Sequence, residues 1–145
     1  MDAQDLPDFD LERYLPYRFS VIAAQLSAKL TKRYKDEFGI SMPEWRVLLN
    51  VGYANDPSVR DIERRVSLEK SKVSRAAAKL EAKGLIVKDI DPGDRRLVKL
   101  RPTQEGRALI GKLIPIARTF QNELSAALNG QEGLLQEALD VLMEK

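Results

Sequence analysis

Apolar residues along this chain recur mostly at steps of three and four positions, with one short region where they alternate. The first pattern predicts amphipathic helices and the second predicts a pair of strands. In chain order, the expected elements are a helix that begins within 11–16 and ends at 38, helices over about 41–54, 58–66 and 70–83, strands over 85–90 and 97–101, and helices over about 103–128 and 131–143.

Several of these helix ends carry local signals. Ser41 precedes Glu44 by three residues, and Ser58 has the same spacing to Asp61, so each serine can cap a helix while the acidic side chain reaches back to it. A glycine follows the first and fourth helices at 39 and 84, where its left-handed conformation ends a helix.

The fourth helix separates its residues onto two sides. Successive residues lie about 100° apart, which groups Val73, Ala76, Ala77 and Leu80 on one side. The other side is small or basic, so its backbone can approach the floor of a DNA groove while hydroxyl and cationic groups meet bases or phosphates. The expected contacts there are Ser71, Lys72, Ser74, Arg75 and Lys79.

The two strands and the turn at 91–96 form a basic hairpin. We expect Asp94 to hold the turn by accepting from turn amides or pairing with a neighbouring arginine. Arg95 or Arg96 can then enter a narrow minor groove, whose negative potential favours a guanidinium. A helix followed by such a hairpin presents one element to a major groove and the other to the adjacent minor groove, so the order predicts DNA binding.

Charge is segregated along the chain in a way that supports this prediction. The segment from Arg60 to Arg101 contains 13 lysines and arginines and 7 acidic residues, a local net charge of +6, whereas the rest of the chain has a net charge of −4. A surface that neutralises phosphates needs this kind of local excess. Arg60, in the first turn of the third helix, therefore joins the expected DNA contacts.

The residues that are absent exclude most other chemistry. The chain has no Cys and no His, which removes disulfides, thiolate nucleophiles, imidazole bases and the usual zinc ligands. We therefore expect no catalytic residue, no metal site and no cofactor, and the protein is not predicted to be an enzyme. The N-terminus does not resemble a signal peptide and no apolar stretch approaches ~20 residues, so a cytoplasmic protein without membrane association is expected.

The outer helices carry more apolar surface than packing against a compact winged helix-turn-helix lobe can bury. In the first helix, one stripe is expected to be buried: Phe19, Ile22, Ala23, Leu26, Leu30 and Tyr34. For the surplus surface, a second copy of the chain is the expected partner. The predicted interface residues are Leu109, Leu113, Ile116, Phe120, Leu135, Leu139 and Leu142.

Four segments, taken together and in this order, resemble the MarR (multiple antibiotic resistance regulator) family of winged-helix transcription factors. They are Val73-Ser-Arg75 followed by Leu80-Glu-Ala-Lys-Gly-Leu-Ile86, then Asp91-Pro-Gly-Asp-Arg-Arg96, then Leu100-Arg-Pro-Thr-Gln-Glu-Gly106. The likeness implies a mainly α fold with a small β-hairpin wing. It further implies a single winged helix-turn-helix protein over 1–145, with a DNA-binding lobe over 41–102 and dimerisation helices over 10–38 and 103–145.

The resemblance also implies partners. Such proteins are homodimers that bind a pseudo-palindromic operator in double-stranded DNA, commonly as repressors, and many release it when a small aromatic or anionic effector binds. A ligand here is expected between the first, second and fifth helices, where Tyr17, Met42, Trp45 and Arg46 offer aromatic walls and one cation. The alternative is that Met42 and Trp45 pack in the core or in an interface, and that Arg46 forms a surface or interdomain pair. For the whole protein, the alternative is a non-enzymatic dimer that uses the winged lobe to bind another protein.

Overall fold

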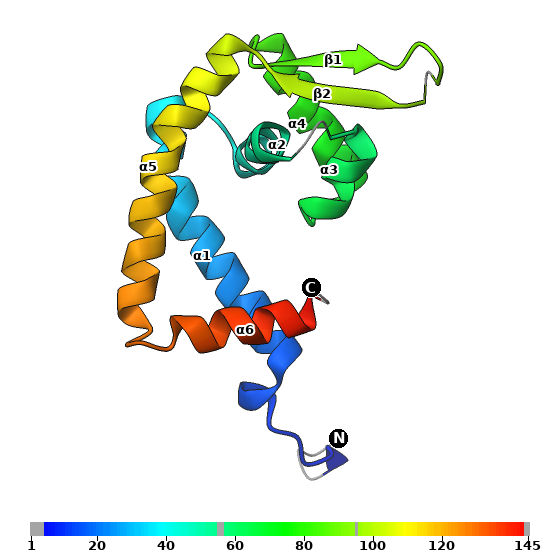
Figure 1. Ribbon diagram of the computed structural model, residues 1–145. Coiled ribbons are helices and arrows are strands. Elements are labelled where there is room, and N and C mark those ends of the chain that lie inside the picture. Colours follow the sequence, from blue (N-terminus) through cyan, green and yellow to red (C-terminus); the bar gives the residue numbers. More distant parts are fainter. Residues whose placement is uncertain (1–4, 55–56, 95, 144–145) are drawn as a thin grey trace.

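Long helices from both ends of the chain lie together on one side of a small lobe in the computed structural model, which describes residues 5–54, 57–94 and 96–143 (Figure 1). Within those residues, the elements are a 3-10 helix η2 (Leu11–Arg13), α1 (Leu15–Phe38), α2 (Met42–Tyr53), α3 (Val59–Arg65), α4 (Lys70–Ala82), β1 (Ile86–Ile90), β2 (Val98–Pro102), α5 (Gln104–Ala127) and α6 (Glu132–Leu142). This is the mainly α fold with one antiparallel hairpin that the sequence predicts.

The predicted capping signals are confirmed. Ser41 Oγ accepts from the amide of Glu44 at 3.3 Å, and Glu44 Oε1 accepts from the Ser41 amide at 3.2 Å. Ser58 and Asp61 repeat this reciprocal pair at 3.1 and 2.9 Å. Gly39 ends α1 at φ +65°, a backbone conformation that costs other residues energy.

The core of the lobe lies where α2 and α4 pack together under the hairpin. β1 and β2 pair in antiparallel register from Ile86 opposite Pro102 to Ile90 opposite Val98. The chain that leads into α3 extends this sheet, because the Leu100 amide donates to the carbonyl of Pro57 at 3.0 Å. Among the fully buried side chains of the lobe, the largest are Leu48, Ile62, Leu80, Ile86 and Leu100.

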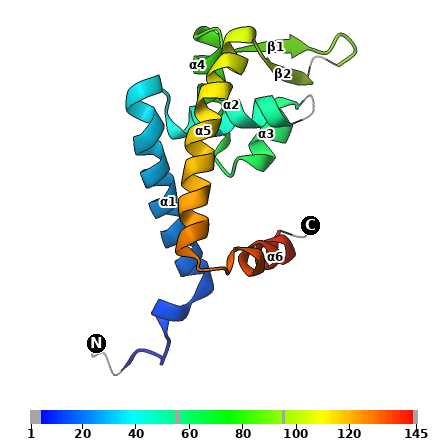
Figure 2. The same ribbon diagram turned by 60° about the vertical axis from the view of Figure 1, so that its left-hand side comes forward.

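Helix α5 follows the hairpin directly and connects the lobe to α1. Its first turn touches the start of the hairpin so closely that a Cβ on Gly106 would lie 2.0 Å from the Leu85 carbonyl oxygen. Farther along, α5 lies beside α1 (Figure 2). Arg33 of α1 joins the two helices, because it forms an ion pair with Glu123 and its guanidinium lies 4.9 Å from the centre of the Phe120 ring. The lobe and the α1–α5 pair are thus one connected structure.

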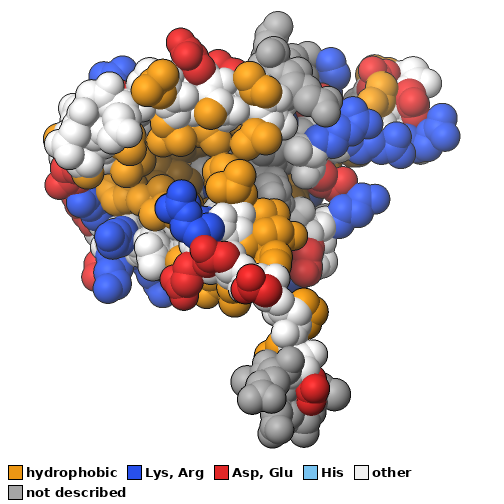
Figure 3. All heavy atoms as spheres, turned by 90° about the horizontal axis from the view of Figure 1, so that it is seen from below, with side chains coloured by type: hydrophobic (Ala, Val, Ile, Leu, Met, Phe, Trp, Pro, Cys, Tyr) orange, Lys and Arg blue, Asp and Glu red, His pale blue; other side chains and the backbone are white. Residues whose placement is uncertain are grey.

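The expected burial of the α1 stripe is wrong over its N-terminal half. Tyr34 is buried, and Leu26 and Leu30 are half-buried, whereas Phe19 and Ile22 are exposed, as is Ala23. Within the described residues, α1 meets α5 and α2 nearer its C-terminal end, which leaves its N-terminal half exposed (Figures 1 and 2). On the face viewed from below, hydrophobic side chains gather over a broad area (Figure 3).

One predicted interface residue also needs correction. Leu113 is fully buried in the core of its own chain, so it has no surface to offer to a second copy. Leu109 and Ile116 are half-buried and pack against the same core. In α6, by contrast, Leu135 and Leu142 are exposed. In the described part of the chain, no helix is both long and apolar enough to cross a membrane.

Candidate nucleic-acid interface and cavity

Helix α4 presents its small and basic residues to solvent. Val73 and Leu80 are fully buried toward the lobe, and Ala76 and Ala77 keep only 3% of their surface exposed. The Nε of Arg75 donates to the Ser71 carbonyl at 3.3 Å, which lays the side chain back along the helix. All five expected contact residues of this helix are exposed: Ser71, Lys72, Ser74, Arg75 and Lys79. The structure therefore places them together on one free face.

The chain reverses direction in a short turn between α3 and α4, as the sequence predicts, and the two helices contact each other. α3 ends with Val66 as its cap, and Ser67 takes the left-handed conformation at φ +54°, which is uncommon for a residue with a side chain. Arg60 is exposed in the first turn of α3. The two helices thus form the helix-turn-helix, with cations along both.

The turn of the hairpin is held by two aspartates. Asp91 Oδ1 accepts from the amides of Gly93 at 2.7 Å and Asp94 at 3.1 Å. Asp94 Oδ1 in turn accepts from the Arg96 amide at 3.0 Å and from its Nε at 3.3 Å, which confirms the expected pairing with a neighbouring arginine. The Arg96 side chain is 85% exposed, and Arg95 lies outside the described residues. Sequence reasoning missed Asp91, although an Asp two residues before a Gly in a turn is its signal.

Two acidic groups in this basic region, Asp89 and Asp61, bond to neighbours within the lobe. Arg101 Nε donates to Asp89 Oδ2 at 2.5 Å, and this bond holds the pKa of the Asp89 carboxyl below its ordinary value. Bonds from the Ser58 amide and hydroxyl lower the pKa of Asp61 in the same way. Both carboxylates are therefore ionised and engaged with neighbours in the lobe.

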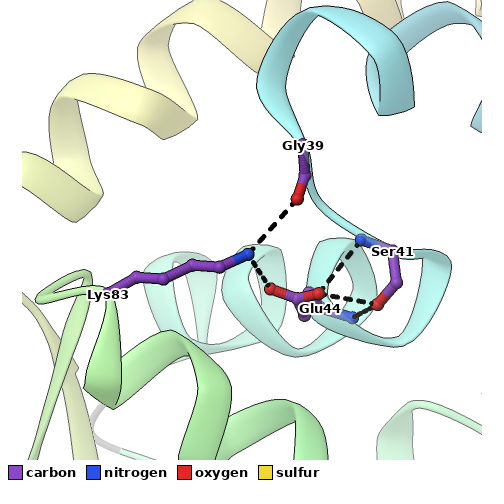
Figure 4. Close-up of polar contacts among 4 residues, drawn as sticks. All are labelled: Gly39, Ser41, Glu44 and Lys83. Carbon is purple, nitrogen blue, oxygen red and sulfur yellow. Dashed lines mark hydrogen bonds and ion pairs between the residues drawn. The ribbon is translucent and has the colours of Figure 1, made fainter.

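A buried carboxylate links three helix ends (Figure 4). Glu44 is 4% exposed, and besides its bonds to Ser41 it accepts from the Nζ of Lys83 at 2.6 Å. Lys83, at the end of α4, also donates to the Gly39 carbonyl at 3.3 Å. Burial raises the pKa of Glu44, but the bonds from Lys83 and Ser41 outweigh it and leave the pKa below its ordinary value. Sequence reasoning had assigned Glu44 only to the capping box.

Three of the four candidate ligand residues line one cavity of about 220 Å³ between α1, α2 and α5, namely Met42, Trp45 and Arg46. The Trp45 ring stacks on that of Tyr34, with 4.3 Å between ring centres and 9° between planes. Burial raises the pKa of Tyr34, against smaller opposing effects of Thr31 and Arg46. Tyr17 is corrected, because it is exposed and does not line this cavity.

Comparison with known proteins gives relatives with the same fold and a family that matches part of the chain. Residues 38–97 match the MarR family. The uncharacterized HTH-type transcriptional regulator YdgJ of Bacillus subtilis is 29% identical over 104 residues, which are 72% of this chain and 62%, less than two thirds, of that protein. A MarR family transcriptional regulator of Silicibacter pomeroyi has a solved structure that matches with a TM-score of 0.78 at 28% identity, over 93% of this chain and 99% of its own.

The structure of BpsR from Bordetella bronchiseptica, whose DNA binding is regulated by 6-hydroxynicotinic acid, matches with a TM-score of 0.79. It is 20% identical and covers 96% of this chain and 99% of its own. At that identity, the likeness supports the winged-helix fold alone.

Proposed function

We propose that this protein, whose residues 38–97 match the MarR family, is a transcriptional regulator that binds double-stranded DNA. The observation that carries this proposal is the exposed face of α4, where small side chains leave room for a groove floor and Lys72, Arg75 and Lys79 supply charge. The proposed action is repression, by occupying an operator.

In this proposal, α4 enters the major groove and the wing follows the adjacent minor groove. Arg75 is the candidate for reading a guanine edge, because a guanidinium can bond O6 and N7 together. Arg96 contributes mainly charge, since Asp94 already orients it at the tip. Cations along α3 and α4 displace counterions, so the affinity falls steeply with salt.

We propose that the binding form is a homodimer on a pseudo-palindromic operator. The single chain leaves large apolar side chains exposed along α1 and α6, among them Leu15, Phe19, Ile22, Leu134 and Leu142. Monomeric proteins rarely leave so large an apolar area in water. A second copy that covers it would place two α4 helices on one side of the duplex, about 34 Å apart.

The cavity beside Trp45 is the proposed effector site. At about 220 Å³ it is smaller than a pocket for a drug-sized ligand, and it suits a single ring that carries a negative charge near Arg46. The regulator would then release DNA when such a compound binds.

Selection of preferred duplexes from a random DNA pool tests the proposal. The expected result is enrichment of a two-fold symmetric site, with Arg75→Ala weakening binding to it by about 1–3 kcal/mol and relaxing its sequence preference. Arg96→Ala should weaken binding to all sequences, most where the flanks are A·T-rich. No measurable DNA affinity at low salt would refute the proposal and favour a lobe that binds another protein.

A further inference from the structure

The C-terminal end of α4 is joined to both of the long helices that flank the lobe. Lys83, the residue that ends α4, donates from its Nζ to the carbonyl of Gly39, where α1 ends, at 3.3 Å. Directly after it, the Gly84 carbonyl accepts from the hydroxyl of Thr103, the cap of α5, at 2.6 Å. This end of α4 is therefore the joint between the lobe and the helices α1 and α5.

The buried carboxylate of Glu44 fixes the Lys83 ammonium in this joint (Figure 4). Glu44 Oε1 accepts from the amide and hydroxyl of Ser41, in the segment between α1 and α2, and Oε2 accepts from Lys83 at 2.6 Å. Because Glu44 is only 4% exposed, water does not replace a partner that is lost. The carboxylate thus holds the end of α4 to the segment that follows α1, through a charged hydrogen bond that is stronger than a neutral one.

The N-terminal end of α4 is held differently. Before that end, the Nη1 of Arg46 donates to the carbonyl of Val66 at 3.4 Å, and Arg46 belongs to α2, inside the lobe. Among the described residues, no hydrogen bond or ion pair joins residues 66–75 to α1 or α5. The expected base contacts Ser71 and Arg75 therefore lie at the end of α4 that is not fastened to the long helices.

The length of α4 amplifies any rotation at the joint. Ser71 lies 12 residues before Lys83, which is about 18 Å of helix. A rotation of about 5° at Lys83 would move Ser71 by roughly 1.5 Å over that length. In a two-fold symmetric dimer the two copies of α4 move in opposite directions, so their separation changes by up to about 3 Å, close to the step of about 3.4 Å between base pairs.

We propose that the bond between Lys83 and Glu44 sets the spacing of the two half-sites that the dimer recognises. By fastening one end of α4 beside α1, it fixes the angle of α4 to the long helices and hence the separation of the two recognition helices on the duplex. Lys83 and Glu44 are positioning residues, which act through α4. The inference rests on the proposed function and its homodimer, and it names the contact that determines the operator geometry.

Duplexes that carry the selected half-sites with one base pair added or removed at the centre measure this spacing. We expect the wild type to bind the selected spacing about tenfold or more tightly than either altered duplex, because one half-site then loses its base contacts. In Lys83→Met this preference should be largely lost. Glu44→Gln should lose it too, since that variant keeps every cation but removes the charge that holds Lys83.

Lys88→Met is the matched control for the loss of a lysine. Lys88 pairs with Glu81 at 3.6 Å on the surface of the lobe, and this pair does not reach α1 or α5. The control variant should keep the wild-type preference between spacings, even where the lost charge lowers its affinity for every duplex. Each variant is assayed well below its melting temperature, which circular dichroism measures, so that only folded protein is compared.

The outcomes separate the inference from the proposed function. If Lys83→Met and Glu44→Gln keep the wild-type preference, or if Lys88→Met loses it to the same extent, the inference is wrong and the function stands. If the wild type binds DNA without any preference between spacings, the homodimer on a symmetric operator is wrong, and the inference falls with it. If the wild type binds no DNA, the proposed function fails as a whole, and so does the inference.

Discussion

Replacing Lys83 by methionine should destabilise the lobe through the buried carboxylate of Glu44. The variant keeps the apolar stem of the side chain but removes the ammonium that donates to Glu44 at 2.6 Å and to the Gly39 carbonyl. The bonds from Ser41 remain. The substitution therefore removes the charged partner that the structure describes for a carboxylate that is 4% exposed.

The expected magnitude follows from how buried each partner is. A hydrogen bond to a charged group contributes about 1.5–3 kcal/mol, and leaving a buried charge unpaired costs more. The Lys83 side chain, however, is 42% exposed, so water screens part of the interaction. We expect a loss of about 1–2 kcal/mol in the free energy of unfolding at neutral pH, or a decrease in Tm of roughly 3–8 °C.

The lowered pKa of Glu44 determines how the stability difference between wild type and variant changes with pH. The pKa of Glu44 lies below its ordinary 4.5 in the folded state, so the stability it contributes is complete above that value and disappears as the pH falls through the lower folded pKa. Without Lys83, two effects that lower the pKa of Glu44 are lost, the hydrogen bond and the nearby positive charge, so this pKa rises relative to the wild type. The difference between wild type and variant should therefore be largest near neutral pH and shrink once both forms are protonated.

Urea unfolding followed by circular dichroism at neutral and acidic pH measures this difference. Lys88→Met is the matched control, because Lys88 pairs with Glu81 at 3.6 Å on the surface, where such pairs contribute about 0–1 kcal/mol. An equal loss in the two variants, or a Lys83→Met loss that stays constant with pH, would refute the reasoning.

Two further predictions use paired substitutions. Gly106→Ala should cost about 2 kcal/mol or more in urea unfolding, because the new Cβ would lie 2.0 Å from the Leu85 carbonyl oxygen, whereas Gly111→Ala in the same helix meets nothing within 4 Å and should be neutral or stabilising. Leu113→Asp should prevent folding of the core, seen as loss of the cooperative unfolding transition, because Leu113 is fully buried. Leu142→Asp, on an exposed position of α6, should leave the helix content unchanged and weaken self-association in analytical ultracentrifugation; a Leu142→Asp dimer as tight as the wild type would contradict the assignment of α6 to the interface.

The amino-acid sequence determined what depends on near neighbours. Ser41 and Glu44, three residues apart, bond within one helical turn, and Gly39 ends α1 through its own backbone freedom. The division of α4 into a buried and an exposed side follows from the helical repeat, and it held for every residue assigned to either side. Local geometry also paired Asp94 with Arg96, which is two positions away.

The tertiary structure decided what depends on residues far apart in the chain. Glu44 and Lys83 are 39 positions apart, and Arg46 is 20 positions from Val66, so no local pattern predicts either contact. Local patterns do not predict the cover of an apolar stripe either. The stripe indicates that one side of a helix is covered, but not which element covers it. The packing of α5 on the lobe buries Leu113, whereas the N-terminal half of α1 stays exposed in the part of the chain that the structure describes. Burial of a hydrophobic side chain is favourable wherever it occurs, and only the positions of the other helices decide which surface covers that side chain.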